Sequence, residues 1–387
     1  GNLKIIFNLP AFVINILITA VVYVGIKESK SLSNAMVILK ILVIVLVIVV
    51  GFFYVEGANW NPFVPNGVYG VMASVSSVFF AYIGFDAIST TAEECKNPRK
   101  DLPRGMFYAL LICTVLYILL ALVLTGMVSY KLLDVRDPLA FVFNQRGLNW
   151  IGGVISVSAI VAMTSVLLVF QMGQPRIWMS MSRDGLMPKR FAKVHPRFKT
   201  PSFATIVTGL VVGIPILFVD YNFVIDFTSI STLFAFVLVC GGVLLLPEEA
   251  KDKNKFSLPK ISARIYMPIF LAGIVIWGIF YGQDYFKGLF QLVPSDKDFR
   301  LFGQHFFSYS DENFMKMSLI VFYIIFIVIT ILSILRNYTL IPILGLLSCL
   351  YLLTSMNIHN WVYFVIWMII GLIVYFSYSF RKSELHK

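Results

Sequence analysis

A glycine and a carboxylate lie close together inside an apolar run that is long enough to cross a membrane. Gly84 and Asp86 stand within the run from Gly70 to Ser89. In hydrocarbon every backbone amide must be hydrogen-bonded, so an interrupted helix persists only where protein or a polar cavity surrounds it. The carbonyls freed by such a break are ligands for a cationic group. The two residues therefore predict a broken membrane helix that receives a positive charge.

Two charged side chains inside apolar runs are the candidates for acid–base chemistry. A charge near the middle of a membrane costs at least about 2.5 kcal/mol, so it is a functional candidate by default. Lys40, near the start of its run, is either a lysine that extends its ammonium to the membrane surface or a proton-responsive cation beside a transport site. Asp86 is either the cap of a second half-helix or a functional carboxylate, and these two roles are compatible.

The composition places the chain among integral membrane proteins. Of its 387 residues, 59% are hydrophobic and only 13% are charged, whereas soluble domains carry about 25% charged residues. The formal net charge of +11 could indicate nucleic-acid binding, but the basic residues lie in loops between apolar runs and build no basic face. We therefore expect a lipid bilayer around the chain and no nucleic-acid partner.

About eleven apolar runs approach or exceed the roughly 20 helical residues that cross a hydrocarbon core. They lack the alternation with a period of two that marks the strands of a membrane barrel, so the sequence predicts an all-α, polytopic helical bundle. The expected spans are Phe7–Val24, Ala35–Tyr54, Gly70–Ser89, Met106–Val128, Ile151–Met172, Phe203–Val219, Ile230–Leu246, Tyr266–Tyr281, Met317–Leu335, Leu340–Met356 and Trp361–Ser379.

Lysine and arginine accumulate in alternate loops, which orients the bundle because these residues stay on the cytoplasmic side. The segment from Arg176 to Lys199 and the tail from Arg381 are rich in them, whereas Gly57 to Tyr69 holds none. The C-terminus is therefore expected in the cytoplasm and the protein in the cell membrane. With eleven crossings Gly1 would lie outside, and no signal peptide precedes the first run. The sequence is thus expected to be the later part of a longer protein.

Other classes of chemistry find little support. The four cysteines are expected to be free thiols and the four histidines fall in loops or the tail, so neither a metal site nor a catalytic triad is predicted. A membrane-embedded enzyme would need more than Lys40 and Asp86, and a channel would show rings of like charge or a filter sequence. A membrane scaffold would not need the interruption at Gly84. The four cysteines are Cys95, Cys113, Cys240 and Cys349, and the four histidines are His195, His305, His359 and His386.

Three motifs resemble the amino acid-polyamine-organocation superfamily, closest to its bacterial cationic amino acid transporter-like permeases. They occur in the family's order and on the predicted sides, and the resemblance covers Leu9 to Leu246 and returns at Ile341 to Tyr378. The motifs are Phe80 to Ala87 with Glu93, Glu94 and Lys96 to Pro103, similar to the sixth helix and its loop; Gly25 to Ser29 with Asn34 and Lys40, similar to the fourth-to-fifth helix junction; and Met163 to Arg176 with Met181 to Pro188, similar to the eighth helix and its loop.

The resemblance implies a five-plus-five inverted repeat that holds its substrate between two broken helices, the second of which is the Gly84 run. In the family the unwound carbonyls receive the substrate's α-ammonium, whose three donors suit three freed carbonyls. Gly84 permits the break because it lacks a side chain. Phe80 and Phe85 would form aromatic gates, or else are ordinary lipid-facing or core aromatics. The implied substrate-binding residues are Phe80, Ala81, Ile83, Gly84, Phe85, Met163 and Thr164.

The resemblance also favours coupling to a proton, with sodium left open and no metal or cofactor expected. Lys40 resembles the fifth-helix lysine that occupies the place of a sodium ion in sodium-coupled relatives. Met163, Thr164 and Ser165 would line the pocket or that place, although Thr and Ser in spans often bond only to their own helix carbonyls. A neutral amino acid is favoured over arginine, because Asp86 is the only acid evident in mid-span and Met163 would narrow the pocket. The implied coupling residues are Lys40, Asp86 and Ser165.

The chain is expected to comprise a transporter core at 1–246, resembling family helices four to ten. A linker with an extra helix pair and an extracellular loop follows at 247–339, and a terminal helix pair with a cytoplasmic tail at 340–387. The family's first three helices, which include the carboxylate-binding half of the site, would precede Gly1. The sequence predicts a secondary active amino acid permease, a proton symporter working by alternating access, with an amino acid exchanger as the alternative. No oligomeric state is predicted.

Overall fold

The computed structural model describes residues 8–25, 30–89, 95–135, 137–219, 221–245, 261–294, 297–301, 304–336 and 338–382. Parts of two sequence motifs lie outside these residues, namely 26–29 and the acidic pair Glu93 and Glu94. The basic loop 246–260 and the end of the tail, 383–387, also lie outside them.

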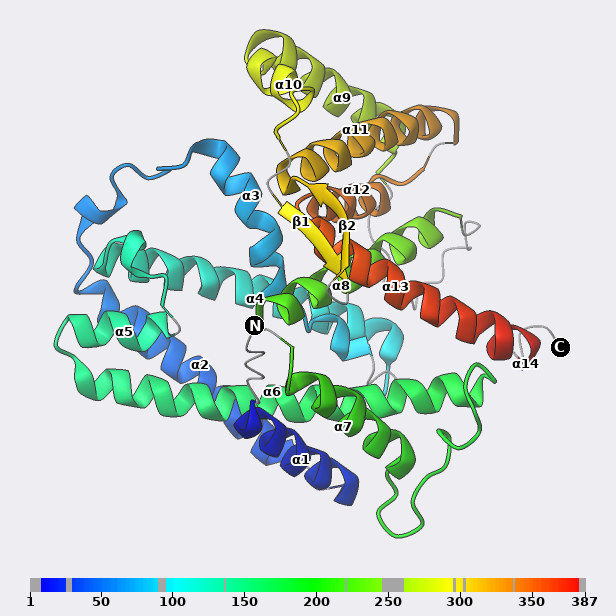
Figure 1. The fold of residues 1–387 in the computed structure, drawn as a ribbon. Helices are drawn as coiled ribbons and strands as arrows, with labels where there is room; N and C mark the ends of the chain where they lie inside the picture. The colour runs from blue at the N-terminus through cyan, green and yellow to red at the C-terminus, as the bar shows by residue number, and fades with distance from the viewer. Residues whose placement is uncertain are drawn as a thin grey trace. The chain divides into compact units, whose positions relative to one another are not determined.

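Helices form nearly all of the described chain (Figure 1), which confirms the all-helical prediction apart from one small hairpin. The hairpin pairs Lys297 with Tyr309 in antiparallel register and lies in the segment expected to be an outer loop. The elements are α1 (Leu9–Val24), α2 (Lys30–Phe52), η1 (Gly57–Trp60), α3 (Gly67–Phe80), α4 (Pro98–Met127), η3 (Tyr130–Leu132), α5 (Pro138–Gln145), α6 (Asn149–Arg183), α7 (Ser202–Ile216), α8 (Tyr221–Leu245), α9 (Ala263–Phe280), α10 (Gln283–Leu289), β1 (Lys297–Leu301), β2 (Gln304–Tyr309), α11 (Asp311–Arg336), α12 (Leu340–Thr354), α13 (Ile358–Val374), η4 (Tyr375–Ser379, a π-helix) and α14 (Phe380–Lys382).

Seven of the described helices are long and apolar enough to cross a membrane, and three shorter apolar helices accompany them. The long ones occur in α2, α4, α6, α8, α9, α11 and the α13–η4 segment, and the short ones are α1, α7 and α12. The remaining expected span, Gly70–Ser89, is different, because α3 ends at Phe80 inside it. The protein is therefore a polytopic membrane protein with one visibly interrupted segment.

The chain divides into two compact units. Unit 1 comprises Gly1–Val68, Gly84–Val219 and Ile373–Lys387, and unit 2 comprises Tyr69–Ile83 and Asp220–Leu372. The division at Ile83 and Gly84 falls within the interrupted segment, so each side of the break belongs to a different unit.

The helix ends of unit 1 follow local sequence signals. The Asn8 side chain accepts a hydrogen bond from the Ala11 amide at the start of α1, and Asp137 does the same for Ala140 at the start of α5. Such side-chain acceptors satisfy amides that the first turn leaves unpaired. Helix α1 ends at Gly25, whose φ of 67° is the left-handed conformation that commonly terminates a helix.

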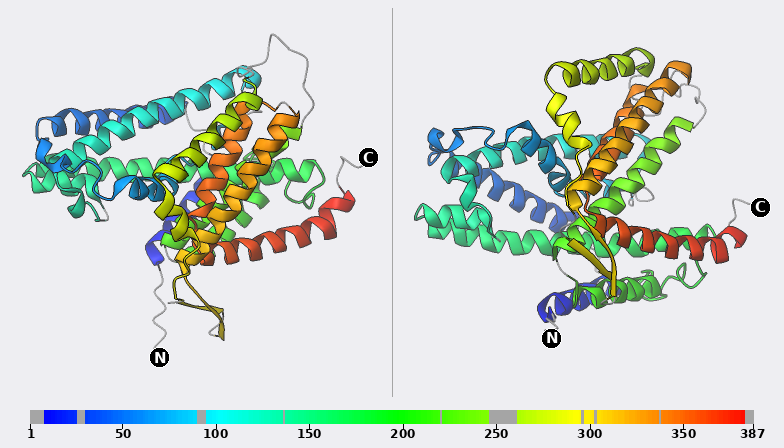
Figure 2. Two further views of the ribbon diagram at one scale, coloured as in Figure 1. Left: turned by 90° about the horizontal axis from the view of Figure 1, so that it is seen from above. Right: turned by 45° about the horizontal axis from the view of Figure 1, so that its top comes forward.

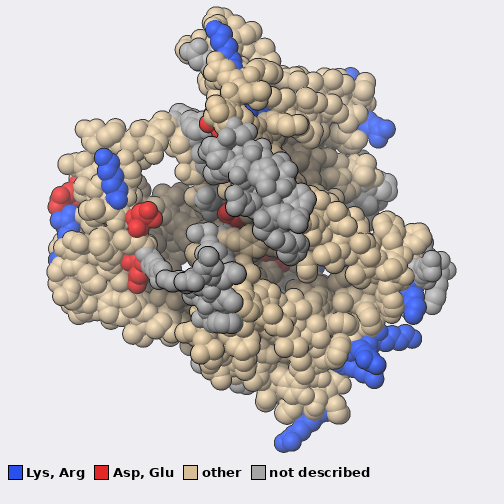
Figure 3. Space-filling view, viewed as in Figure 1, with Lys and Arg blue, Asp and Glu red and all other residues tan. Residues whose placement is uncertain are grey.

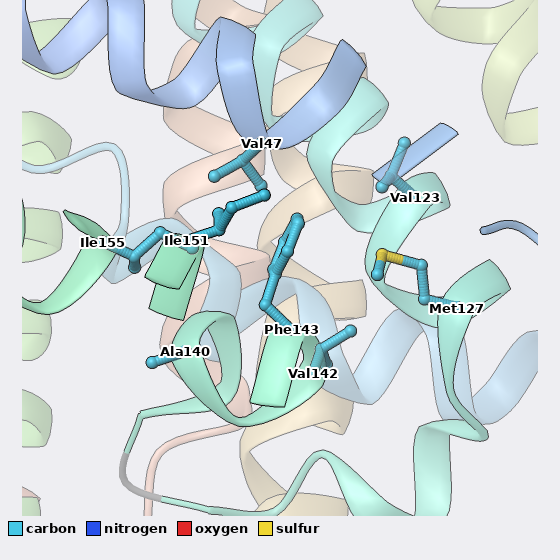
Figure 4. Close-up of a cluster of buried hydrophobic side chains, with 8 residues drawn as sticks. All are labelled: Val47, Val123, Met127, Ala140, Val142, Phe143, Ile151 and Ile155. Atoms are coloured by element: carbon cyan, nitrogen blue, oxygen red, sulfur yellow. The ribbon is translucent and has the colours of Figure 1, made fainter. Parts of the chain in front are cut away.

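The core of unit 1 gathers around the short helix α5 (Figure 4). Phe143 of α5 and Met127 of α4 are fully buried, and Val47 of α2 and Ile151 of α6 lie in the same cluster. Arg146, just after α5, pairs with Glu56 at 2.6 Å and donates to the Met127 carbonyl. These contacts join the ends of α2 and α4 to α5. Helix α5 is not predicted by the sequence, because an eight-residue helix is too short to stand out as an apolar run.

A polar seam joins α1, α6 and α7 in the same unit. Asn15 donates to the Gly209 carbonyl at 2.9 Å, and Gln171 donates to the Thr19 hydroxyl at 2.9 Å. A Cβ atom built on Gly209 would come within 2.6 Å of the Thr19 side chain, so α7 approaches α1 more closely than any larger residue would permit. Close contact across small residues and interhelical hydrogen bonds are what associate helices in lipid.

Replacing Gly209 by alanine is expected to destabilise this seam by about 1–3 kcal/mol, the usual cost of overpacking. Thr19 cannot move away freely, because its hydroxyl also donates to the Asn15 carbonyl. The thermal unfolding midpoint of the purified protein in detergent measures the effect. Gly153→Ala in α6 is the control, since nothing lies within 4 Å of the added Cβ and alanine favours a helix over glycine. Equal midpoints for the two variants would contradict the close approach.

Unit 2 contains α8, α9, α11, α12 and most of α13, together with most of α3, α10 and the hairpin. Within it, α12 packs against α8 and α9 against α11 (Figure 2). One cluster joins α8 to the end of α12 and the start of α13 through Ile230, Leu233, Leu353 and Phe364. A second cluster joins α9, α11 and α12 through Met267, Phe326 and Ile343. The extra helix pair expected after the core, α9 and α11, is thus held to α12 by its own buried side chains.

Candidate functional site

After α3 the backbone leaves the helix in a turn that main-chain hydrogen bonds hold in place. The amides of Ala81, Tyr82 and Ile83 donate in succession to the carbonyls three residues earlier, at 3.0 to 3.1 Å. Gly84 then has a φ of 125°, a conformation that residues with a side chain rarely adopt. A short 3-10 turn follows at 86–89. The structure confirms that the helix breaks at Gly84.

Asp86 stabilises this break from its C-terminal side. Its Oδ1 accepts a hydrogen bond of 3.2 Å from the Gly84 amide, and its carbonyl accepts one of 2.6 Å from the Ser89 hydroxyl. The described bond of the carboxylate therefore runs back to a preceding amide. The alternative that Asp86 also caps a following half-helix stays a prediction.

The residues expected to bind substrate lie on both sides of the break. The Phe80 carbonyl already accepts a bond from Ile83, so a substrate ammonium would use its second lone pair. Phe80 and Phe85 are half-buried, and Ala81 is exposed. Within unit 1, Gly84 lies beside α6, because its added Cβ would meet the Phe170 ring at 3.7 Å.

Lys40 and Ser165 meet across two helices of unit 1. The Lys40 ammonium, on α2, donates to the hydroxyl of Ser165, on α6. Ser165 is 8% exposed and itself donates to the Ala162 carbonyl at 2.9 Å. Lys40 is half-buried, and this bond gives its ammonium a partner on a second helix. Its role in coupling stays a prediction.

The two other α6 residues of the predicted site differ from Ser165. Thr164 donates to the Ile160 carbonyl of its own helix at 2.9 Å, which is the alternative considered for such residues. Met163 is 60% exposed. The structure brings Lys40 and Ser165 together but gives Met163 and Thr164 no described partner on another helix.

The described residues do not form a cluster of metal-ligating side chains. No group of three or more His, Cys, Asp or Glu side chains gathers there, and the four cysteines are free. One acid that sequence analysis missed does lie within a span. Asp226 is in α8, which begins at Tyr221, ahead of the apolar run that started the predicted span at Ile230. A longer helical window that allowed one polar residue would have found it.

A family model described as amino acid permease matches residues 3–296, and a second model, of the C-terminus of such permeases, matches residues 338–383. The chain belongs to the amino acid permease family. The resemblance drawn from the three motifs is therefore confirmed, and the family is one of transporters and not of enzymes.

Several curated relatives resemble this permease closely. It is 45% identical to the methylthioribose transporter of Bacillus subtilis over 273 residues, 70% of this chain and 59% of the relative. It is 35% identical to the branched-chain amino acid permease BcaP of the same organism over 383 residues, 99% of this chain and 66% of the relative. It is 29% identical to cationic amino acid transporter 3, mitochondrial, of Arabidopsis thaliana, over 99% of this chain and 70% of the relative. The chain thus spans less than two thirds of the length of the first two.

Proposed function

We propose that this permease is a secondary active transporter of neutral amino acids, coupled to protons and working by alternating access of a five-plus-five inverted repeat. The observation that carries the proposal is the helix break at 81–85, held open by Gly84 and tied by Asp86. A break inside a span persists only where protein surrounds it or a polar cavity adjoins it, and transporters use such breaks as substrate sites. Family membership supports the same reading.

A neutral substrate is proposed over a cationic one because Asp86 is the one carboxylate of the described residues at the break. Its Oδ1 accepts a bond from the Gly84 amide, so part of its capacity to accept hydrogen bonds serves the shape of the break. The relatives named for branched-chain and for cationic amino acids give the two classes that must be compared.

Uptake by the purified protein in lipid vesicles tests the substrate class. We expect labelled leucine to accumulate, and competition by neutral amino acids to exceed competition by arginine. 4-Methylpentanoate, which is leucine without its ammonium, should not compete measurably, because a site built to bond an amine rejects an analogue that lacks it. Equal competition by leucine and 4-methylpentanoate would exclude the proposed carbonyl site.

A second candidate substrate deserves the same assay. The relative with 45% identity is named a methylthioribose transporter, and that sugar carries no ammonium for the unwound carbonyls to bind. Methylthioribose uptake without any leucine uptake would therefore replace the amino acid assignment.

The orientation follows from the loop charges. Lys and Arg gather over the segment between α6 and α7 (Figure 3), where Lys189, Arg190, Lys193 and Arg197 are all exposed. We place this segment and the C-terminus in the cytoplasm, because basic loops stay on that side, and the protein in the cell membrane.

Labelling with a membrane-impermeant thiol reagent tests this orientation in intact cells. The engineered cysteines must stand at exposed positions. Ser182, in the basic segment, is unsuitable because it is buried and its hydroxyl donates to the Pro188 carbonyl. In a variant without its native cysteines, Leu292→Cys should be labelled and Lys193→Cys should be labelled only after the cells are opened. The reverse pattern would invert the topology.

A further inference from the structure

Asp226 is a carboxylate in a membrane-spanning helix that the transport proposal leaves unused. It lies in the apolar span Phe223–Leu245. Its Oδ2 accepts a hydrogen bond of 2.9 Å from the side-chain amide of Asn360, in the first turn of α13. Asn360 is 5% exposed. Ionisable side chains inside a span are expensive and mark ion or proton sites by default.

Asp226 is half-buried, and aromatic and aliphatic side chains of unit 2 lie beside it along α8 and beside Asn360 along α13. Phe223 and Phe227, which flank Asp226 on α8, stack at 5.6 Å between centroids, and Tyr363 of α13 meets Phe223 edge to face at 5.2 Å. Ile230, one turn further along α8, is fully buried. Asp226 therefore lies at the edge of an apolar cluster, where an uncompensated charge is costly.

No fixed cation holds Asp226 in its ionised form among the described residues. The ion pairs found there join Arg146 to Glu56 and Lys316 to Glu312. The described residues of α3, α8, α12 and α13, the elements packed around it, include no lysine and no arginine. The other titratable side chains described on these elements are His359 and Tyr363 on α13, Tyr351 and Cys349 on α12, and Tyr221 and Cys240 on α8.

We propose that Asp226 and Asn360 form a proton-binding site of this transporter, separate from Lys40. An amide is a partner that serves both states of a carboxyl group: its NH₂ donates to the carboxylate, and its oxygen accepts from the protonated acid. A lysine or arginine in its place would favour only the charged state. The proton adds to a carboxylate oxygen, and the new O–H donates to Asn360 Oδ1 once the amide has turned over.

A metal cation fits the same place less well. Hard cations such as calcium take six to eight oxygen ligands, whereas this pair supplies one carboxylate and one amide, and no group of three metal-ligating residues occurs among the described residues. A proton needs a single oxygen. The indole N–H of Trp361, the residue after Asn360, is buried without a hydrogen-bond partner in the described part of the chain. Such a donor next to the amide in sequence suits an oxygen acceptor and repels a metal cation.

Infrared difference spectra between alkaline and acid pH, recorded on the purified full-length protein in lipid vesicles, test the site directly. A protonated aspartic acid gives a carboxyl stretching band. Asp226→Asn should remove one such band from the difference spectrum, because it keeps the shape of the side chain but cannot titrate. Asp137→Asn, the same chemical change at the cap of α5, is the matched control and should leave that band in place.

The partner is tested by Asn360→Leu. This variant keeps the carboxyl group, so the band assigned to Asp226 should persist but move in frequency, since the hydrogen-bond partner of the acid is gone. A difference spectrum of Asp226→Asn that superimposes on that of the unaltered protein would overturn the proposal. A band that does not move in Asn360→Leu would overturn the pairing, and this second arm also decides the matter if Asp226→Asn fails to accumulate.

Discussion

Replacing Gly84 by alanine is expected to lower substrate uptake by about fivefold to more than a hundredfold, while the amount of protein in the membrane stays the same. The φ of 125° at Gly84 is strained for any residue with a Cβ, at a cost of about 1–3 kcal/mol, and each 1.36 kcal/mol corresponds to about a factor of ten. Space is not the obstacle, because the added Cβ would meet only the Phe170 ring at an ordinary 3.7 Å. Uptake of labelled substrate into vesicles, normalised to inserted protein, measures the loss.

Two further substitutions separate backbone strain from other effects. Gly84→Val should abolish uptake, since a β-branched side chain restricts the backbone further. Gly105→Ala in α4 has nothing within 4 Å of its added Cβ and should transport normally. Normal uptake by Gly84→Ala and Gly84→Val would remove the break from the substrate site.

Replacing Lys40 by alanine is expected to abolish accumulation driven by a pH gradient and to spare exchange of substrate across the membrane. The Lys40 ammonium bridges α2 to Ser165 of α6, and a charge-assisted bond of this kind is roughly twice as strong as a neutral one. We expect the protonated bridge and bound substrate to favour the same conformation. Linkage then requires each to strengthen binding of the other. Vesicles with and without internal substrate, at equal and unequal pH, separate the two activities.

Variants around Lys40 identify what the ammonium does. Ser165→Ala removes the acceptor but keeps the charge, so it should weaken coupling without abolishing it. Lys131→Ala, at an exposed lysine of η3, is the control and should leave accumulation unchanged. If Lys40→Ala still accumulated substrate with pH as the only driving force, Lys40 would be a structural anchor, and Asp226 and Asp86 would be the next candidates. Exchange without net accumulation in the unaltered protein would favour the antiporter.

Local sequence predicted the features whose physics is local. An apolar run of suitable length forms a helix in lipid whatever surrounds it. Gly84 within such a run predicted the break, because residues with a side chain rarely adopt a positive φ such as the 125° found there. The hairpin at 297–309 and the short helix α5 escaped prediction, because neither has the length or apolar period of a span.

Pairings between distant positions could not be read from spacing. The partners Lys40 and Ser165 are separated by 125 positions, and Asp226 and Asn360 by 134. Ser165 entered the predicted site through the family resemblance alone. Asp226 was overlooked because the apolar run that defined its span begins at Ile230, although the helix continues upstream to Tyr221.

The turn at 81–83 holds its shape through successive main-chain bonds to Val78, Phe79 and Phe80, and it spends no side chain of its own on them. Because these bonds use main-chain atoms alone, a substitution at Ala81 or Ile83 is expected to change the side chain presented at the break while the turn keeps its path. If the break binds substrate as proposed, what is carried can change there apart from the fold, whereas Gly84 and Asp86 hold the backbone itself.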